Sequence, residues 1–188
     1  METKLPTVGA DASGGNGSPK GRQVTKAKLT TLEIVSDPGE GAQKCAQTFG
    51  AVSAKMGNGV WTVEIIPAEV QPPPRLPAGA SGNRIRIGSV PVTNWGDKSA
   101  VIVALNEQVL LARHRLGALE DDAVVLLENM WKTHKDEDIQ KQWVDALEEL
   151  SGSNYRISEV PMEEECLKIV DNPQRGKNMW VLGLLCYI

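Results

Sequence analysis

The fold is decided by the run Thr31-Leu-Glu-Ile-Val-Ser-Asp-Pro-Gly-Glu-Gly-Ala-Gln43, in which a strand, a turn and a helix follow one another. Thr31–Ser36 is rich in β-branched and apolar residues and predicts the strand. Asp37–Gly41 predicts a tight glycine turn, and the helix is expected from about Ala42. This order places helix N-terminal N–H groups at the end of a strand, where phosphates are commonly bound. A purely structural tight turn is the alternative interpretation of Asp37–Gly41.

The rest of the chain alternates between strand and helix patterns. Ser99–Leu105 is continuously apolar, which is typical of a strand buried on both faces of a parallel sheet. Such alternation predicts an α/β protein, a Rossmann-like three-layer sandwich with a mostly parallel sheet. The further expected elements are a helix from Ala42 to the stop at Met56–Gly59, a strand Val60–Ile66, a helix Glu107–Leu116 capped by Asn106, a strand Ala123–Leu127, a helix Asp136–Leu150, a strand Tyr155–Val160 and a short helix opened by Pro161.

One stretch interrupts this alternation. Pro67–Gly82 is a sixteen-residue segment with five prolines, and loops of this length in compact domains are usually functional or contact a partner. The alternating run Asn83–Gly88 is expected to turn at Gly88-Ser89 into Val90–Val92, which gives a hairpin-like insertion.

The two ends differ from the body in composition. Residues 1–28 are rich in glycine and almost free of large apolar residues, so we expect a disordered tail followed by one domain, residues 29–188. Gly176–Ile188 is apolar nearly all round. This segment is expected to pack against a partner subunit or, as we favour, to continue into further sequence.

Composition and charge argue against several classes of function. The chain has a net charge of −4, and its first 28 residues carry a small basic excess, so the rest of the chain is acidic. An acidic domain argues against nucleic acid as a partner, because nucleic acid is bound by basic surfaces. No secretory signal or apolar run of membrane-spanning length is present, so a cytoplasmic protein without membrane contact is expected. Cys45, Cys166 and Cys186 are widely spaced and predict reduced, buried thiols rather than a metal or cluster site. His114 and His134 are expected at the surface, and no catalytic residue or metal ligand stands out.

Three segments in the same order resemble the gamma domain of 2-oxoacid:ferredoxin oxidoreductases, especially the copy fused to the N-terminus of the 2-oxoglutarate-type alpha subunit. They are Ser36–Gln43, Arg75–Gly88 and Asn94–Asn106, and Gly176–Leu184 is also similar to a segment of those subunits. The resemblance covers about Glu33–Ile188. It implies a complex that converts a 2-oxoacid and coenzyme A to acyl-CoA and carbon dioxide and passes electrons to ferredoxin.

The resemblance also implies where the cofactors and partners lie. Thiamine diphosphate, Mg and the iron–sulfur cluster are expected in other parts of the complex, and none is expected on this chain alone. The implied partners are the thiamine-diphosphate-binding beta subunit, the rest of the alpha subunit, coenzyme A and, indirectly, ferredoxin. A non-catalytic Rossmann-like protein that binds a flavin or a nucleotide remains the alternative.

Candidate coenzyme A contacts come from the gamma-type segments. The turn departs from the glycine-richer family pattern at Pro38 and Glu40, and a carboxylate is unfavourable beside a pyrophosphate. Gly79 and Ala80 replace the lysines of pyruvate-type relatives, so arginines would supply the charge by bidentate phosphate contacts. For Arg84 and Arg86 a solvated strand face is the alternative, and for Ser81-Gly82 a plain strand entry. The candidate contacts are Arg75, Ser81, Gly82, Arg84, Gly39 and Gly41.

Overall fold

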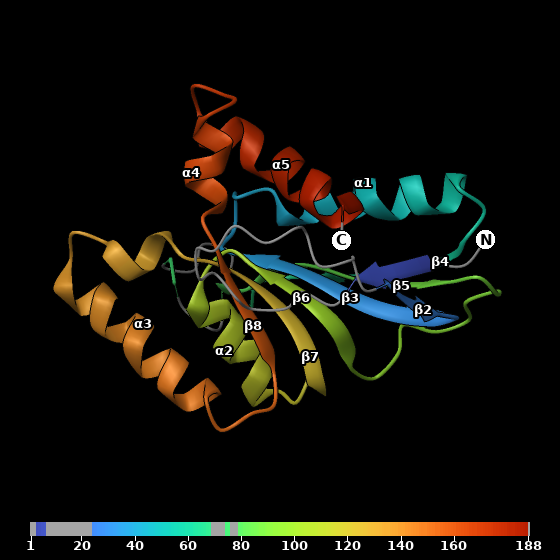
Figure 1. The fold of residues 1–188 in the computed structure, drawn as a ribbon, viewed down its shortest axis with the longest axis horizontal. Coiled ribbons are helices and arrows are strands. Elements are labelled where there is room, and N and C mark those ends of the chain that lie inside the picture. The colour runs from blue at the N-terminus through green and yellow to red at the C-terminus, as the bar shows by residue number, and fades with distance from the viewer. Residues whose placement is uncertain (1–2, 7–23, 69–73, 76–78, 188) are drawn as a thin grey trace, which may run out of the picture.

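The computed structural model describes residues 3–6, 24–68, 74–75 and 79–187. A six-stranded sheet in the order β4-β5-β3-β6-β7-β8 forms its centre (Figure 1). The elements are β1 Thr3–Pro6, β2 Val24–Ala27, β3 Leu29–Ser36, α1 Ala42–Lys55, β4 Gly59–Ile65, β5 Ser81–Gly88, β6 Ser99–Ala104, α2 Glu107–Arg115, β7 Leu119–Glu128, the 3-10 helix η2 Met130–Thr133, α3 Glu137–Leu150, β8 Arg156–Val160, α4 Met162–Leu167 and α5 Pro173–Tyr187.

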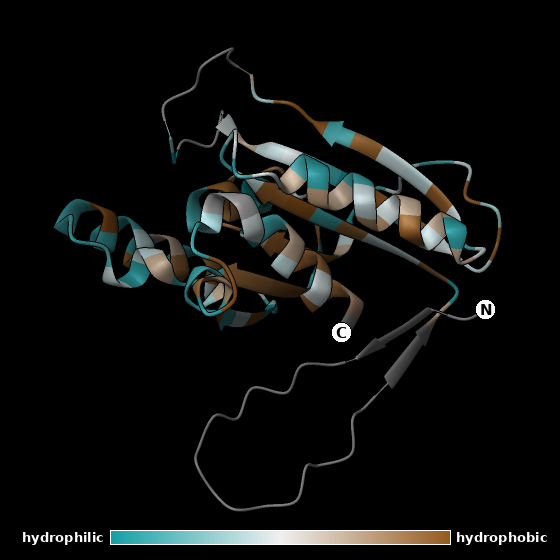
Figure 2. Cartoon of the chain, turned by 90° about the horizontal axis from the view of Figure 1, so that it is seen from above, coloured by the Kyte–Doolittle hydropathy of each residue, from teal (hydrophilic) through white to brown (hydrophobic). Residues whose placement is uncertain are grey.

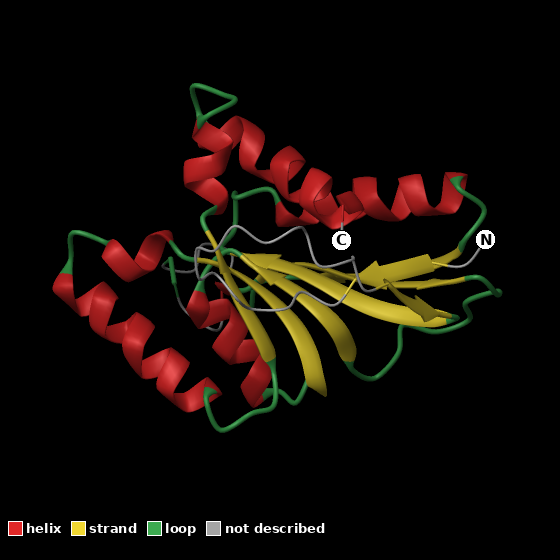
Figure 3. Cartoon of the chain, in the orientation of Figure 1, coloured by secondary structure: helices red, strands yellow, loops and turns green. Residues whose placement is uncertain are grey.

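The helices cover the two faces of the sheet unequally. Figures 1 and 3 show α1, α4 and α5 on one face, and α2 and α3 on the other. The second face is covered by helices only beneath β6, β7 and β8. This arrangement confirms the predicted three-layer α/β sandwich with a mostly parallel sheet.

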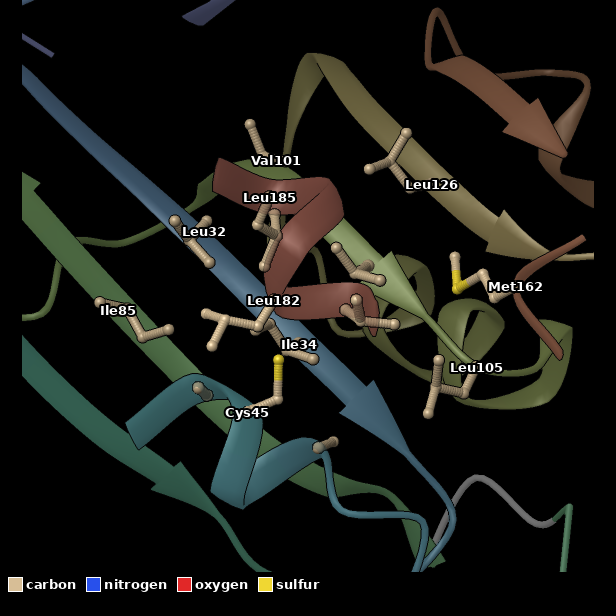
Figure 4. Close-up of a cluster of buried hydrophobic side chains, with 14 of the residues drawn as sticks. Leu32, Ile34, Cys45, Ile85, Val101, Leu105, Leu126, Met162, Leu182 and Leu185 are labelled. Carbon is tan, nitrogen blue, oxygen red and sulfur yellow. The ribbon is translucent and has the colours of Figure 1, made fainter. Parts of the chain in front are cut away.

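Two apolar clusters hold the layers together. The first joins α1 and α5 to the sheet through side chains such as Leu32, Cys45, Ile85 and Leu182 (Figure 4). The second packs α2 and α3 on the opposite face. In Figure 2 the central strands are strongly hydrophobic, whereas α3 carries many hydrophilic residues. The apolar C-terminal segment is part of α5, which packs on the sheet of the same chain through Val181, Leu182 and Leu185.

The antiparallel insertion was predicted with the wrong partner. β3, β6, β7 and β8 run parallel, and β5 is antiparallel to both of its neighbours, β3 and β4. Val90–Val92 forms no strand. Pro91 lacks the N–H that a ladder needs, and β5 pairs instead with β4 across the proline-rich connection.

The predicted stop after α1 and the predicted cap of α2 are both present. Gly57 follows the last turn of α1 with a φ of 90°, a conformation that favours glycine. The Asn106 side chain accepts a hydrogen bond from the Val109 N–H at 2.9 Å and caps α2. Asp136 caps α3 in the same way, accepting from the Asp138 N–H at 2.9 Å.

Several predictions fall mainly on residues outside the description. Within the region expected to be disordered, residues 3–6 and 24–27 are described as a two-stranded antiparallel pair, and residues 7–23 are not described. Much of the proline-rich connection, residues 69–73 and 76–78, also lies outside the described residues. Among the described helices, none has the length and apolar character needed to cross a membrane.

Candidate functional site

A cavity of about 390 Å³ opens at the carboxyl edge of the parallel strands. The turn after β3, the start of η2 after β7, the start of α4 after β8 and one residue of α5 form its walls. In open α/β sheets ligands bind beyond this edge, so its position alone marks a candidate site. The lining residues are Pro38, Gly39, Glu40, Met130, Trp131, Glu163 and Lys177.

Lys177 provides the ammonium group among the described residues that line this cavity, and its side chain is only 7% exposed. Its Nζ lies 3.0 Å from a Glu163 carboxylate oxygen and 3.7 Å from Glu40 Oε1. Glu128, fully buried, adds a third carboxylate nearby and accepts hydrogen bonds from the Met130 and Glu163 backbone N–H groups. Among the described residues of this cavity, one cation thus lies beside three carboxylates.

This imbalance shifts the protonation equilibria of the cluster. Burial raises the pKa of the Glu40 carboxyl to about 7, although Lys177 and the Asp37 N–H oppose that shift. Burial also raises the pKa of Glu128. For Lys177 burial disfavours the charge, but Glu40, Glu163 and Glu128 together outweigh it and raise the pKa. The charge of the cavity therefore changes near neutral pH, through Glu40.

A second polar group lies beside this cavity, between β3 and β6. The helices that follow these two strands pack on opposite faces, so this is the point where the winding of the sheet reverses. The Arg75 N–H donates to both Asp37 carboxylate oxygens, at 3.1 and 3.0 Å. The guanidinium pairs with buried Glu107 and lies 4.3 Å from the ring centroid of Trp131, a lining residue of the cavity.

Arg75 adopts an unusual backbone conformation, with a φ of 61° in the left-handed region. Such a conformation costs a non-glycine residue about 1–3 kcal/mol, and residues of this kind concentrate at functional sites. The described neighbours hold it in place, because Asp37 fixes its N–H and Glu107 and Trp131 fix its side chain.

The structure places the six predicted contacts apart from one another. Gly39 lines the cavity, and Arg75 adjoins it through Trp131. Ser81 and Gly82 lie on β5, opposite Ser36 and Val35 at the carboxyl edge. Arg84 lies deeper in the sheet.

Packing accounts for three of these residues. A side chain on Gly82 would collide with the Ile34 carbonyl group, and one on Gly41 would meet Asn178 of α5 at 3.1 Å. The Arg84 Nε donates to Glu33 at 2.8 Å, and its NH1 group donates to the Gly96 carbonyl at 2.9 Å. Arg86 bonds Asn94 in the same loop. Arg84 and Arg86 thus bind the loop before β6 to the sheet.

The thiols and histidines agree with the expectations only in part. Cys45 and Cys166 are buried, but Cys186 is exposed on α5, contrary to the prediction of three buried thiols. His114 and His134 are half-buried, and the His114 ring contacts the Tyr155 hydroxyl at 2.9 Å. In the described part of the chain, no group of three or more His, Cys, Asp or Glu side chains is arranged to hold a metal ion. These residues do not fit an iron–sulfur cluster or the Mg²⁺ of thiamine diphosphate.

The comparisons with known proteins agree on one relationship. The chain is 28% identical over 164 residues to the 2-oxoglutarate oxidoreductase subunit KorA of Mycobacterium tuberculosis, a match covering 84% of this chain and 25% of that protein. The resemblance to the gamma domain of 2-oxoacid:ferredoxin oxidoreductases is confirmed. The chain thus spans about a quarter of the length of this curated relative. No family model matches the chain.

Solved structures show the same fold. The pyruvate oxidoreductase subunit PORC of Thermotoga maritima aligns with a TM-score of 0.55 and 19% identity, covering 85% of this chain and 75% of that one. The gamma subunit of a keto/oxoacid ferredoxin oxidoreductase from Geobacter sulfurreducens gives 0.58 and 16%, with the same coverage. The 2-oxoglutarate:ferredoxin oxidoreductase of Magnetococcus marinus, solved with 2-oxoglutarate, coenzyme A and succinyl-CoA, gives 0.58 and 18%, covering 81% and 23%.

Sequence reasoning did not identify most of the cavity. Gly39 is a predicted contact and Lys177 lies in the family-like segment Gly176–Leu184, whereas no sequence pattern predicted a ligand contact at Met130, Trp131 or Glu163. A lysine in the otherwise apolar Gly176–Ile188 is the one signal that could have identified this cation.

Proposed function

We propose that this chain is the gamma-type domain of a 2-oxoacid:ferredoxin oxidoreductase of the 2-oxoglutarate type. The assembled enzyme would join the acyl group of a 2-oxoacid to the sulfur of coenzyme A. The carboxylate leaves as carbon dioxide, the thiol proton is released, and an electron pair passes to ferredoxin. Similarity to the KorA subunit supports the 2-oxoglutarate type. The chain itself would contribute to subunit assembly and to coenzyme A access, with the other subunits carrying the reaction.

The cavity at the carboxyl edge is the observation that carries the coenzyme A proposal. Pro38, Met130 and Trp131 offer apolar walls, and Lys177 and the carboxylates offer hydrogen-bonding groups. Because carboxylates outnumber the ammonium group among the described lining residues, the cavity suits the neutral, amide-containing arm of coenzyme A better than its phosphates. Gly39 would allow close approach along the turn, and no described atom lies within 4 Å of a side chain built there.

The sequence-derived contacts Arg75, Ser81, Gly82, Arg84, Gly39 and Gly41 remain part of the proposal, and the geometry ranks them. Gly39 and Arg75 are favoured because they line or adjoin the cavity. Arg84 is the least favoured, since Glu33 and two backbone carbonyls already engage its guanidinium. Lys177 and Trp131 join the set.

The test measures coenzyme A kinetics in the enzyme assembled with its thiamine-diphosphate-binding partner. Replacing Lys177 and Glu163 together by glutamine removes the ion pair without leaving Glu163 charged and unpaired. The double variant should raise the KM for coenzyme A roughly tenfold to a hundredfold, the value of one charge-assisted hydrogen bond, with little change in the KM for the 2-oxoacid. Lys98→Gln, at the opposite edge of the sheet, is the matched control. Equal coenzyme A kinetics in both variants would leave the cavity without this role.

A further inference from the structure

The outer edge of β4 is an unusual surface in this domain. β4 ends the six-stranded sheet and pairs with β5 along its other edge. Most of its seven residues are exposed, including Trp61 at 40% and Val63 at 36%. A strand edge presents backbone N–H and C=O groups that can pair with another strand.

β4 lacks most of the features that usually protect such an edge. Gly59–Ile65 contains no proline or lysine, and its register with β5 is regular from end to end. Glu64 is the single charged residue, and the Gln47 side chain donates to it at 3.2 Å. On the face that carries Trp61, no helix covers this half of the sheet (Figure 3).

The helix that borders this edge is uncharged on the flank nearest β4. A side chain built on Gly50 of α1 would meet Thr62 at 3.2 Å and Val60 at 3.6 Å, which fixes the flank. Gln43, Gln47 and Ala54 share it with Gly50 at helical spacing. A second α1 could approach along this flank without burying a charged side chain of the helix itself.

We infer that β4 pairs antiparallel with β4 of a second copy of this chain, around a two-fold axis at Thr62. The pairing would join two six-stranded sheets into one continuous sheet, an isologous contact. It would place Trp61 opposite Val63 of the second copy, an aromatic and β-branched pair that stabilises antiparallel strands. On the other face Val60 would lie opposite Glu64 of the second copy.

The charge distribution fits a second copy. In this register the two Glu64 residues are four strand positions apart, roughly 14 Å, which exceeds the Debye length of about 8 Å at physiological ionic strength. The contact therefore brings no like charges together, although the chain as a whole is acidic. The inference is independent of the proposed activity.

Sedimentation velocity of the full chain tests this pairing. The wild-type chain should be a dimer at micromolar concentration. Thr62→Lys places two ammonium groups directly opposite each other and should raise the dissociation constant roughly tenfold or more. Mixing Thr62→Lys with Thr62→Glu should restore the dimer as a heterodimer. Val144→Lys, at an exposed position on α3, is the control and should leave the dimer intact.

Cross-linking gives a second readout that does not depend on lysine being tolerated in β4. Thr62→Cys in a Cys186→Ser background should form a disulfide-linked dimer under mild oxidation, because residues opposite each other at the axis are within disulfide reach. Val144→Cys in the same background should not. A monomeric wild-type chain, a Thr62→Lys dimer as tight as wild type, or no cross-link at Thr62 would each overturn the inference.

Discussion

Two glutamates close together in the sequence differ in burial and in the counter-ions that surround them. Glu33, in the middle of β3, is 0% exposed and accepts hydrogen bonds from Arg84 at 2.8 Å, from Arg113 at 2.7 and 2.9 Å and from Ser99 at 3.1 Å. Glu40, in the turn after the same strand, is 23% exposed and shares Lys177 with Glu163. The first carboxylate has two arginines to itself, and the second competes for one lysine.

The difference separates a centre that holds the fold from one suited to a ligand. Around Glu33 the charges and hydrogen bonds are matched, and they tie β3, β5, β6 and α2 together. Around Glu40 the burial is incompletely compensated, so the pKa of Glu40 rises to about 7. Under-compensated charges in a cavity are typical of functional sites, whereas matched buried pairs more often serve structure.

The largest expected effect comes from breaking the matched centre. Glu33→Gln leaves the nearly buried guanidinium groups of Arg84 and Arg113 without their counter-ion. We expect the free energy of unfolding to fall by about 3–5 kcal/mol in urea denaturation. Glu149→Gln, which breaks the exposed pair with Arg115, should change it far less. Similar losses in the two variants would contradict the comparison.

Two glycines test the same difference between the tightly packed sheet and the turn that lines the cavity. Gly82→Ala would drive its methyl group into the Ile34 carbonyl, between two strands that cannot separate, and should cost about 3 kcal/mol or more. The methyl group of Gly39→Ala would meet no described atom within 4 Å, and the backbone φ of 91° is what opposes the change. We therefore expect the free energy of unfolding to fall by about 1–2 kcal/mol. Thermal unfolding of both variants measures the difference, and the reverse order would show that the turn is the more constrained region.

The smallest expected effect concerns pH. Because the folded pKa of Glu40 is raised from 4.5 to about 7, the folded state binds the extra proton in this range. Glu40 therefore contributes stability below about pH 4.5 that is lost as the pH rises through about 7.

Glu40→Gln should flatten that part of the pH profile and raise the free energy of unfolding by about 1–2 kcal/mol above pH 7, because Lys177 keeps Glu163 as a partner. Chemical denaturation across this pH range measures the profile. An unchanged slope in the variant would assign the pH dependence to other groups, with Glu128 and Asp37 the next to replace, since burial raises the pKa of each.

The sequence by itself determined the elements and their caps. The continuous apolar run of β6, the glycine stop after α1 and the Asn106 cap are local signals, and local sterics and hydrogen bonding are sufficient to read them. The resemblance to the gamma domain also rests on sequence. The hairpin partner of β5 was missed because strand pairing depends on which edges meet, and the flanking residues do not encode this.

Only the tertiary structure decided the site. Charge counting pointed to Arg84 as a ligand contact, but folding places it against Glu33, a residue some fifty positions away in the chain. Lys177 and Glu40 are even further apart in sequence, and they meet because the carboxyl ends of the parallel strands and the start of α5 converge at one edge. A side chain's charge is local, whereas its solvation and its counter-ion depend on which distant segments pack beside it.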